Sequence, residues 1–570
     1  MATTLERVPA HLRQFVAQQD YGAYDEIDQA VWRFILIQTQ ARLRDTAHPA
    51  YLRGLARTGI GLERIPRIEE MDARLREYGW GAVCVDGFIP PRAFQEFQAL
   101  GIMTIAGEIR SYEHLAYTPA PDIVHESAGH APIIPDPSYR HYLQRFGEIG
   151  ARAFATPHDT EQYAAIYALS ELKEDPSASD ADIAAAQAKL ADDSERISEA
   201  ALLSRLHWWT VEYGLVGTPD DYRLYGAGLL SSLGESHFCH EPSVEKRVLS
   251  ASCVEVGYDI TKPQPHLYVA ECFDQLSDVL DEVAAGLAQR RGDAYALDAA
   301  LRSREVATLS LCSGLQLTGV VADVHSEAQN PDLAILNPGF AFARAGRHLP
   351  GAGPGERPGR CACVLLPHAA AAAQHEPGEI ELRLGENLRL RGQLSHSRSS
   401  PHDRDAWFVL RGATLTRGDQ PLVKEDHLTV VTGGRLASAF AGPADPSFWP
   451  DSDFPQTRIP PRRPVPASYR ALRGLYQQAL ELWKDPESPA LAAGFERIAE
   501  QLRSDFPEDW LLRWNLLECL RKLDHGVVLA SQLRDELLEI EARHPRDAPI
   551  TMGLRHLGLA PRRPTGGNHG

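Results

Sequence analysis

The sequence predicts a mainly α-helical domain over residues 1–305, followed by a small β-rich domain and a helical carboxy-terminal segment. Three observations support this division. The chain has 570 residues, which is too long for one domain. Strand patterns begin near residue 306 and end near residue 447, whereas helical patterns dominate on both sides. A proline-rich stretch at 448–466 precedes the last helices, and such stretches form stiff linkers.

Helical patterns dominate the first 305 residues. Residues 28–36 have the apolar clustering of a packed helix, residues 164–201 favour two helices, and residues 273–287 favour another. Residues 267–270 are strand-like, and no strand signal follows them in this part of the chain. We therefore expect a mainly α fold for residues 1–305.

The β-rich region over residues 306–447 shows alternating apolar residues. Residues 308–311 and 315–321 predict strands. Alternation at residues 380–384, a turn at Gly385-Glu386-Asn387, and renewed alternation at 388–390 predict a hairpin. The sequence indicates no role for this domain.

The carboxy-terminal segment over residues 467–560 shows helical periodicity in two stretches, 472–483 and 510–519. Helix pairs of this kind resemble tetratricopeptide-type units, although no repeat of fixed period is present. A surface for a protein partner and a plain helical cap therefore both remain open. Residues 561–570 are expected to form a disordered tail.

The charge balance excludes several classes of partner. Acidic residues outnumber basic ones, 77 against 58, and the net charge of −19 argues against nucleic acid and anionic membranes.

No apolar run is long enough to span a bilayer, and the first residues lack a signal-peptide core. The eight cysteines follow no disulfide pattern, so we expect reduced thiols in a cytoplasmic protein.

The segment His125-Glu126-Ser127-Ala128-Gly129-His130 predicts a metal site. A zinc protease helix places its two histidines at i and i+4, whereas these stand at i and i+5, about 140° apart on an ideal α-helix. Gly129 offers a bend or helix end that lets the imidazoles converge. Glu212 is the best third ligand, because it lies in an apolar, aromatic stretch where an unpartnered carboxylate is costly. Two histidines and a carboxylate form the facial site of non-haem Fe(II) oxygenases.

These segments resemble the pterin-dependent aromatic amino acid hydroxylases. Five motifs occur in the family's order between about residues 60 and 285, namely 65–71, 117–130, 208–215, 225–235 and 259–270. The resemblance implies the aromatic amino acid hydroxylase fold for residues 1–305. It implies a monooxygenase that uses Fe(II), a tetrahydropterin as electron donor and O2, most similar to long bacterial phenylalanine 4-monooxygenases. Phenylalanine is then the leading substrate, with tryptophan and tyrosine as alternatives.

The resemblance also implies roles for individual residues. Fe(II) would be held by His125, His130 and Glu212. Phe94 would stack on the pterin, with Phe97 as the nearby alternative, and Glu126 would lie on the pterin side. Asp122 would orient an iron-bound imidazole through its other nitrogen. The amino acid would contact Arg110, Tyr117, Thr118, Pro119, Trp208 and Ser231, and the planar fork of Arg110 suits its carboxylate.

The sequence departs from the family in three places. The 82 positions from His130 to Glu212 include an insertion at 164–201 that could cover the active-site mouth. His207 replaces an aromatic residue beside Trp208, which bears on substrate choice. Too few residues precede the first motif for the family's regulatory domain, and its tetramerising tail is not recognisable.

Two hypotheses from other classes are weaker. A zinc hydrolase with Glu126 as general base predicts histidines at i and i+4, which the sequence lacks. A non-catalytic scaffold that binds partners through residues 466–560 predicts a lost iron ligand or substrate arginine, and none is lost.

Overall fold

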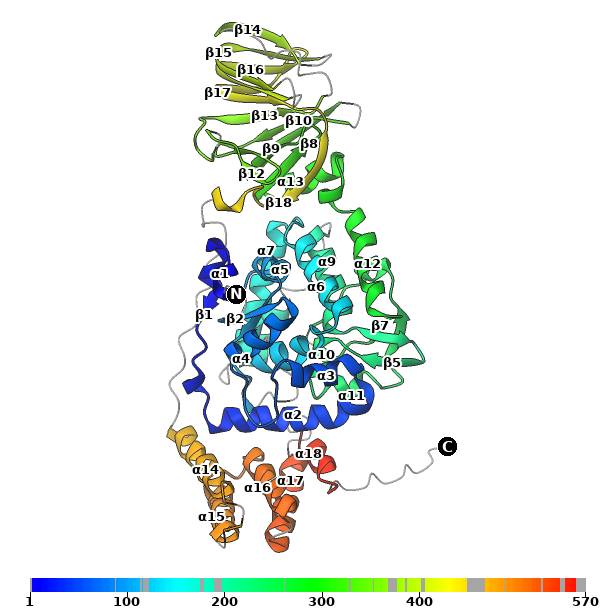
Figure 1. The fold of residues 1–570 in the computed structure, drawn as a ribbon, viewed down its shortest axis with the longest axis vertical. Helices are drawn as coiled ribbons and strands as arrows, with labels where there is room; N and C mark the ends of the chain where they lie inside the picture. Colours follow the sequence, from blue (N-terminus) through cyan, green and yellow to red (C-terminus); the bar gives the residue numbers. More distant parts are fainter. Residues whose placement is uncertain are drawn as a thin grey trace.

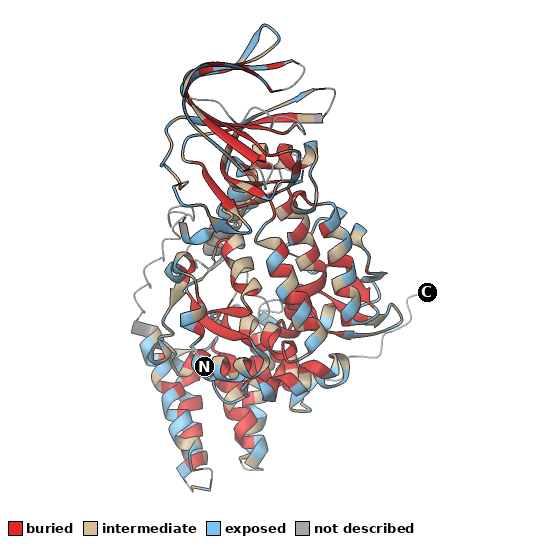
Figure 2. Cartoon of the chain, turned by 45° about the horizontal axis from the view of Figure 1, so that its top comes forward, coloured by how far each residue is buried: buried red, intermediate tan, exposed pale blue. Residues whose placement is uncertain are grey.

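The computed structural model describes residues 3–559 except 88, 113–114, 116–121, 175–178, 189–196, 261, 328–329, 352, 367–376, 385–386, 401–404, 449–466, 486, 489, 524–525 and 544–548. The described elements form three tiers along the longest axis (Figure 1). A β-rich tier lies at one end, a larger tier of helices and short strands lies in the middle, and the carboxy-terminal helices lie at the other end. Buried residues occur in all three tiers (Figure 2).

The middle tier holds twelve described α-helices and two small sheets. Its helices are α1 (Thr4–Arg7), α2 (Glu26–Thr46), α3 (Pro49–Arg57), α4 (Ile68–Leu75), α5 (Pro91–Ala99), α6 (Pro137–Gly150), α7 (Pro157–Glu174), α8 (Asp180–Ala188), α9 (Glu199–His207), α10 (Ala227–Ser231), α11 (Glu235–Phe238) and α12 (Phe273–Ala285). Helix α13 (Ala294–Ser303) lies in the β-rich tier (Figure 1). One sheet has the order β1-β2-β3, with β1 (Val16–Ala17), β2 (Gly81–Val85) and β3 (Ile102–Ala106). The other has the order β5-β4-β7-β6, with β4 (Leu215–Thr218), β5 (Asp221–Leu224), β6 (Glu245–Val248) and β7 (His266–Ala270). The predicted strand at 267–270 is confirmed as part of β7.

Helix α2 joins the middle tier to the carboxy-terminal tier. Asp25 starts the helix, because its carboxylate accepts from the amides of Ile27 and Asp28. The helix is buried on several sides rather than along one stripe, so it needs neighbours on both sides. The rings of Phe34 and Trp514 meet edge to face with centroids 4.7 Å apart.

The carboxy-terminal tier consists of α14 (Ala467–Trp483), α15 (Ala490–Asp505), α16 (Leu511–Leu523), α17 (Val527–Arg543) and α18 (Ile550–His556). Their buried residues belong to the same apolar cluster as those of α2 and α6. The buried faces of these helices thus pack within the chain, while Leu480, Val527 and Val528 stay exposed. The predicted tail at 561–570 lies outside the described residues. So does the predicted linker at 448–466, except for residue 448.

Replacement of Trp514 by alanine tests this shared core. The side chain is fully buried against Phe34, so we expect Trp514→Ala to lower the free energy of unfolding by about 3–5 kcal/mol. Urea unfolding followed by circular dichroism measures the change. Leu480→Ala is the control, because Leu480 is 45% exposed and its loss is expected to cost little. An unchanged midpoint for Trp514→Ala would show that the two tiers are not packed as described.

The β-rich tier is one large sheet with a long path β12-β11-β9-β10-β13-β17-β16-β15-β14, while β8 pairs with β9 and β18. Its strands are β8 (Val306–Leu311), β9 (Leu315–Glu327), β10 (Asn330–Leu336), β11 (Ala341–Arg344), β12 (Arg347–His348), β13 (Arg360–Val364), β14 (Gly378–Arg383), β15 (Leu388–Ser400), β16 (Asp405–Arg417), β17 (Gln420–Thr432) and β18 (Leu436–Ala441). The predicted hairpin is confirmed, with Leu382 opposite Leu390. The core of this tier includes Phe154 and residues of α13, so it is continuous with the middle tier.

The described helices include none that combines the length and the apolar character needed to cross a membrane.

Candidate metal centre and active site

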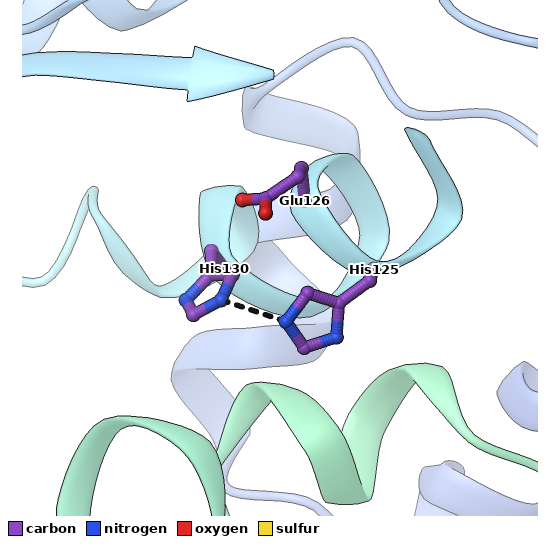
Figure 3. A group of neighbouring side chains, drawn as sticks. All are labelled: His125, Glu126 and His130. Carbon is purple, nitrogen blue, oxygen red and sulfur yellow. Dashed lines mark hydrogen bonds between the residues drawn. The ribbon is translucent and has the colours of Figure 1, made fainter. Parts of the chain in front are cut away.

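Both segments that carry the predicted metal ligands are π-helices. They are η5 (Val124–His130) and η7 (Trp208–Glu212). A π-helix bonds residue i to residue i+5, so residues five apart lie one turn apart, and such turns are frequent at functional sites. His125 and His130 therefore meet with their ring centroids 4.8 Å apart (Figure 3). The expected bend or helix end at Gly129 is not what brings the imidazoles together, because the π-helix runs through Gly129 and ends at His130. A Cβ at Gly129 would lie 2.9 Å from the carbonyl oxygen of Ala227, so this glycine allows η5 to pack on α10.

Three ligand atoms converge at this point. Nε2 of His125 lies 3.1 Å from Nε2 of His130. The Glu212 carboxylate places one oxygen 3.3 Å from His125 Nε2 and the other 3.3 Å from His130 Nε2. An ion with bonds of about 2.1 Å has neighbouring ligands about 3.0 Å apart at right angles and about 3.4 Å apart at tetrahedral angles. The three residues therefore fit a single metal ion. Burial alone raises the pKa of Glu212, but the two imidazoles outweigh it and hold that pKa well below its ordinary value.

Ser231 sets the tautomer of His125. The Ser231 hydroxyl donates to the carbonyl oxygen of Ala227 at 2.7 Å, and its oxygen lies 3.0 Å from Nδ1 of His125. Because the only hydroxyl proton is already donated, Nδ1 must donate to Ser231 and Nε2 carries the lone pair for a metal. In this arrangement Ser231 has no proton left for a substrate carboxylate. The geometry favours a role in positioning the metal ligand over the predicted contact with substrate.

Asp122 does not contact the imidazole, so the expectation that it orients one through its other nitrogen was wrong. Its carboxylate accepts from Nε and Nη2 of Arg110, each at 2.8 Å, and from the backbone amide of His125 at 2.9 Å. Both side chains are buried, and Nη1 of Arg110 has no hydrogen-bond partner among the described residues. Burial raises the pKa of Asp122, but the guanidinium outweighs it, and the pKa lies below its ordinary value. Asp122 therefore fixes both the start of η5 and the orientation of Arg110.

A cavity of about 480 Å³ opens beside the three ligands, and its size is that of a small-molecule site. His125, His130 and Glu212 line it together with Glu126 and Phe94. Burial raises the pKa of Glu126 to about 7, and the anionic Glu212 adds to this while His130 opposes it. Phe94 and Glu126 thus line the same cavity as the ligand triad.

Comparison with known proteins identifies the family. The family of biopterin-dependent aromatic amino acid hydroxylases matches residues 19–171 and 178–309, which together make half of the chain. The chain belongs to this family. The enzyme is accordingly an iron- and tetrahydropterin-dependent aromatic amino acid monooxygenase. The fold expected for the amino-terminal part is that of the family.

Curated relatives of this hydroxylase include bacterial phenylalanine-4-hydroxylases. It is 29% identical to a phenylalanine-4-hydroxylase of Mesorhizobium japonicum, over 50% of this chain and 90% of that protein. It is 26% identical to a phenylalanine-4-hydroxylase of Caulobacter vibrioides, over 61% of this chain and 96% of that protein. A crystal structure of Chromobacterium violaceum phenylalanine hydroxylase with iron(III) and 7,8-dihydrobiopterin matches at 24% identity and a TM-score of 0.39, covering 50% of this chain and 91% of that one.

Of the predicted substrate contacts, the structure describes Arg110, Trp208 and Ser231. The ring of Trp208 stacks on Tyr258 with centroids 4.3 Å apart, and its Nε1 donates to Gln264 Oε1 at 3.3 Å. Gln264 in turn donates to the carbonyl oxygens of Asp259 and Lys262 and so holds the 259–265 loop. Tyr117, Thr118 and Pro119 lie outside the described residues.

His207 lies beside the candidate metal ligand Glu212, although the sequence analysis treated it only as a substitution in the family pattern. Its Nδ1 lies 3.7 Å from a Glu212 oxygen, and its ring packs against Phe94 and Phe146. Burial lowers the pKa of His207 to about 4, so the ring is neutral at pH 7. The five-residue spacing from His207 to Glu212 repeats that from His125 to His130, and this repetition was visible in the sequence.

The Ser231 hydroxyl can be tested directly. We expect Ser231→Ala to weaken Fe(II) binding by about 10–100-fold, because His125 loses the acceptor that fixes its tautomer. Anaerobic Fe(II) titration measures the change. The control is Ser252→Ala, which removes an exposed hydroxyl bonded only to Ser250. Unchanged iron affinity in Ser231→Ala would contradict this assignment.

Proposed function

We propose that this enzyme hydroxylates free L-phenylalanine to L-tyrosine. The convergence of His125, His130 and Glu212 beside the cavity carries the proposal, since two imidazoles and a carboxylate leave positions on iron open. The curated relatives from Mesorhizobium japonicum and Caulobacter vibrioides support phenylalanine as the substrate, and this chain covers nearly their whole length.

The triad holds Fe(II), which with the reduced pterin supplies the activation of O2 and the electrons for ring hydroxylation. Glu212 remains anionic over the working pH range, because its pKa is low. Ser231 keeps the proton of His125 on Nδ1 and leaves Nε2 for the metal. These contacts fix the ligands before substrate binds.

Arg110 binds the carboxylate of the amino acid in this proposal. Two of its guanidinium nitrogens are held by Asp122, and the third, Nη1, is buried without a described partner. Such an atom costs free energy until an acceptor reaches it, and a carboxylate is a strong acceptor. Trp208 and the segment Tyr117–Pro119 are proposed to enclose the ring.

Phe94 and Glu126 form the cofactor side in this proposal. Phe94 offers an aromatic face in the cavity, and Glu126 offers a carboxyl group whose pKa is raised by burial. The cavity of about 480 Å³ is large enough to hold a pterin.

Product analysis tests the function. The protein is loaded anaerobically with Fe(II) and then given tetrahydropterin, ¹⁸O2 and one amino acid at a time. We expect phenylalanine to yield tyrosine carrying one ¹⁸O atom, with the highest kcat/KM of the three aromatic amino acids. A higher value for tryptophan or tyrosine would assign that substrate instead. Iron-loaded protein that consumes no pterin and forms no product would refute the function and favour the scaffold hypothesis.

We also propose that the enzyme works in the cytoplasm, because all eight cysteines are free thiols and none forms a disulfide. A protein partner for residues 467–560 stays a prediction.

A further inference from the structure

A third imidazole lies beside the carboxylate that completes the ligand triad. His207 caps the amino-terminal end of η7, five residues before Glu212, so the π-helix places the two side chains one turn apart. Nδ1 of His207 lies 3.7 Å from Oε1 of Glu212. The same oxygen faces His130, whereas Oε2 faces His125. Oε1 of Glu212 therefore lies between a metal ligand and a histidine that belongs to no ligand set.

Two phenyl rings hold the ring of His207 in place. Phe94 from α5 meets it edge to face with centroids 5.9 Å apart, and Phe146 from α6 does so at 5.3 Å. The side chain of His207 is only 13% exposed. Rings that pack closely on several sides have little freedom to turn. The approach of Nδ1 to Glu212 is therefore fixed by the packing of these helices.

The position of the proton on His207 follows from the surroundings of its two nitrogens. A neutral imidazole carries one proton, on either nitrogen. With the proton on Nε2, the lone pair of Nδ1 would face the anionic carboxylate of Glu212, and Nε2 is buried with no hydrogen-bond partner among the described residues. With the proton on Nδ1, the N–H group faces Oε1 instead. A protonated ring would also donate from Nδ1, so the direction of this contact does not depend on the charge of His207.

The Glu212 carboxylate has few donors to choose from. Within the described part of the chain, its oxygens are reached only by the imidazoles of His125, His130 and His207. A metal takes the Nε2 lone pairs of the first two rings, so neither then has a proton to donate at Nε2. A buried carboxylate oxygen that is not bound to the metal needs a donor, and His207 is the described residue that remains. Its distance exceeds an ordinary hydrogen bond by about 0.7 Å, which a small rotation of the carboxylate closes.

This donor bears on how Glu212 binds the metal. A carboxylate binds a metal through one oxygen or through both. A hydrogen bond to Oε1 draws on the charge of that oxygen and competes with the metal for it, so Oε2 is favoured as the only ligand atom. Binding through one oxygen leaves one more position open on the metal than binding through both.

We propose that His207 is a positioning residue that keeps Glu212 on the metal through one oxygen. Its Nδ1 donates to Oε1, and Oε2 is the ligand atom. A further position on the metal stays open in consequence. The inference deepens the proposed function and rests on the triad as the Fe(II) site, but it does not depend on phenylalanine as the substrate. The role falls to a residue at which this chain departs from the family pattern.

Two replacements separate the donor from the ring. His207→Phe keeps an aromatic ring between Phe94 and Phe146 but removes the donor. His207→Asn removes the ring but keeps a donor close to the position of Nδ1, because the asparagine side chain ends in an amide nitrogen. A role in packing alone predicts damage in His207→Asn and little in His207→Phe, and the donor role predicts the reverse. His141→Phe is the matched control, since His141 is exposed on α6.

The number of waters on the metal reports how Glu212 binds. The full chain is loaded anaerobically with Fe(II), given nitric oxide as a paramagnetic probe and transferred to D2O, and the deuterium modulation of the electron spin echo is recorded. With nitric oxide bound, an iron of about six positions keeps about two waters if Glu212 supplies one oxygen and about one if it supplies both. We expect the modulation from bound water in His207→Phe to be about half of that in the wild type, in His207→Asn and in the control.

Equal modulation in the wild type and His207→Phe would overturn the proposal. A loss in His207→Asn as large as that in His207→Phe, or a wild type with the modulation of a single water, would overturn it as well. The expected pattern in a protein that forms no tyrosine from phenylalanine would refute the proposed function and leave this inference standing. Protein that gives no iron–nitric oxide signal would refute both.

Discussion

Asp122→Asn is expected to lower the free energy of unfolding by about 3–5 kcal/mol, because it leaves the Arg110 guanidinium buried without its counter-charge. The same change weakens the acceptor of the His125 amide, which positions the first metal ligand. We therefore expect iron affinity to fall as well. Urea unfolding and anaerobic Fe(II) titration measure the two effects.

A double replacement separates the stability effect from the functional one. Arg110→Met with Asp122→Leu removes both charges, and buried pairs replaced together by apolar residues often lose little stability. We expect this variant to fold with most of the wild-type stability but to lose binding of the amino acid. An Asp122→Asn protein as stable as the wild type would show that the pair is not buried as described. Full substrate affinity in the double variant would remove Arg110 from the substrate site.

Glu212→Ala is expected to reduce turnover by at least about 1,000-fold, equivalent to about 4 kcal/mol. The carboxylate supplies one of three ligands and both of its oxygens face imidazoles, so its loss leaves only two ligands. Tyrosine formation from phenylalanine at saturating Fe(II) measures the effect. The control is Glu148→Ala, which removes an exposed carboxylate on α6. Turnover within tenfold of the wild type in Glu212→Ala would mean that another residue holds the metal.

The metal ligands could be predicted from the sequence, but the way they converge could not. His125, His130 and Glu212 are recognisable by residue type and by the motifs around them. Their convergence depends on two π-helices, and the α-helical period assumed for any helical segment places residues five apart on different faces. Gly129 was accordingly given a bending role, although it serves packing against Ala227.

The residues that hydrogen-bond to the metal ligands were harder to predict than the metal ligands themselves. Ser231 is 106 positions from His125, and the sequence carries no sign of which polar residue meets Nδ1. The predictions gave that contact to Asp122 and the substrate to Ser231, whereas Ser231 meets Nδ1 of His125 and Asp122 holds Arg110 and the His125 amide. The strand β14 was predictable because alternation of apolar residues marks its buried face, whereas β7 is a short run that is buried throughout.

Iron K-edge X-ray absorption of the Fe(II)-loaded protein tests the central claim most directly. The account predicts one iron per chain bound only by nitrogen and oxygen atoms, with the multiple-scattering signal of two imidazoles. It further predicts that His207→Phe leaves this signal unchanged, because the His207 ring lies beside Glu212 and is not a ligand. A sulfur ligand, or a third imidazole that disappears in His207→Phe, would contradict the account.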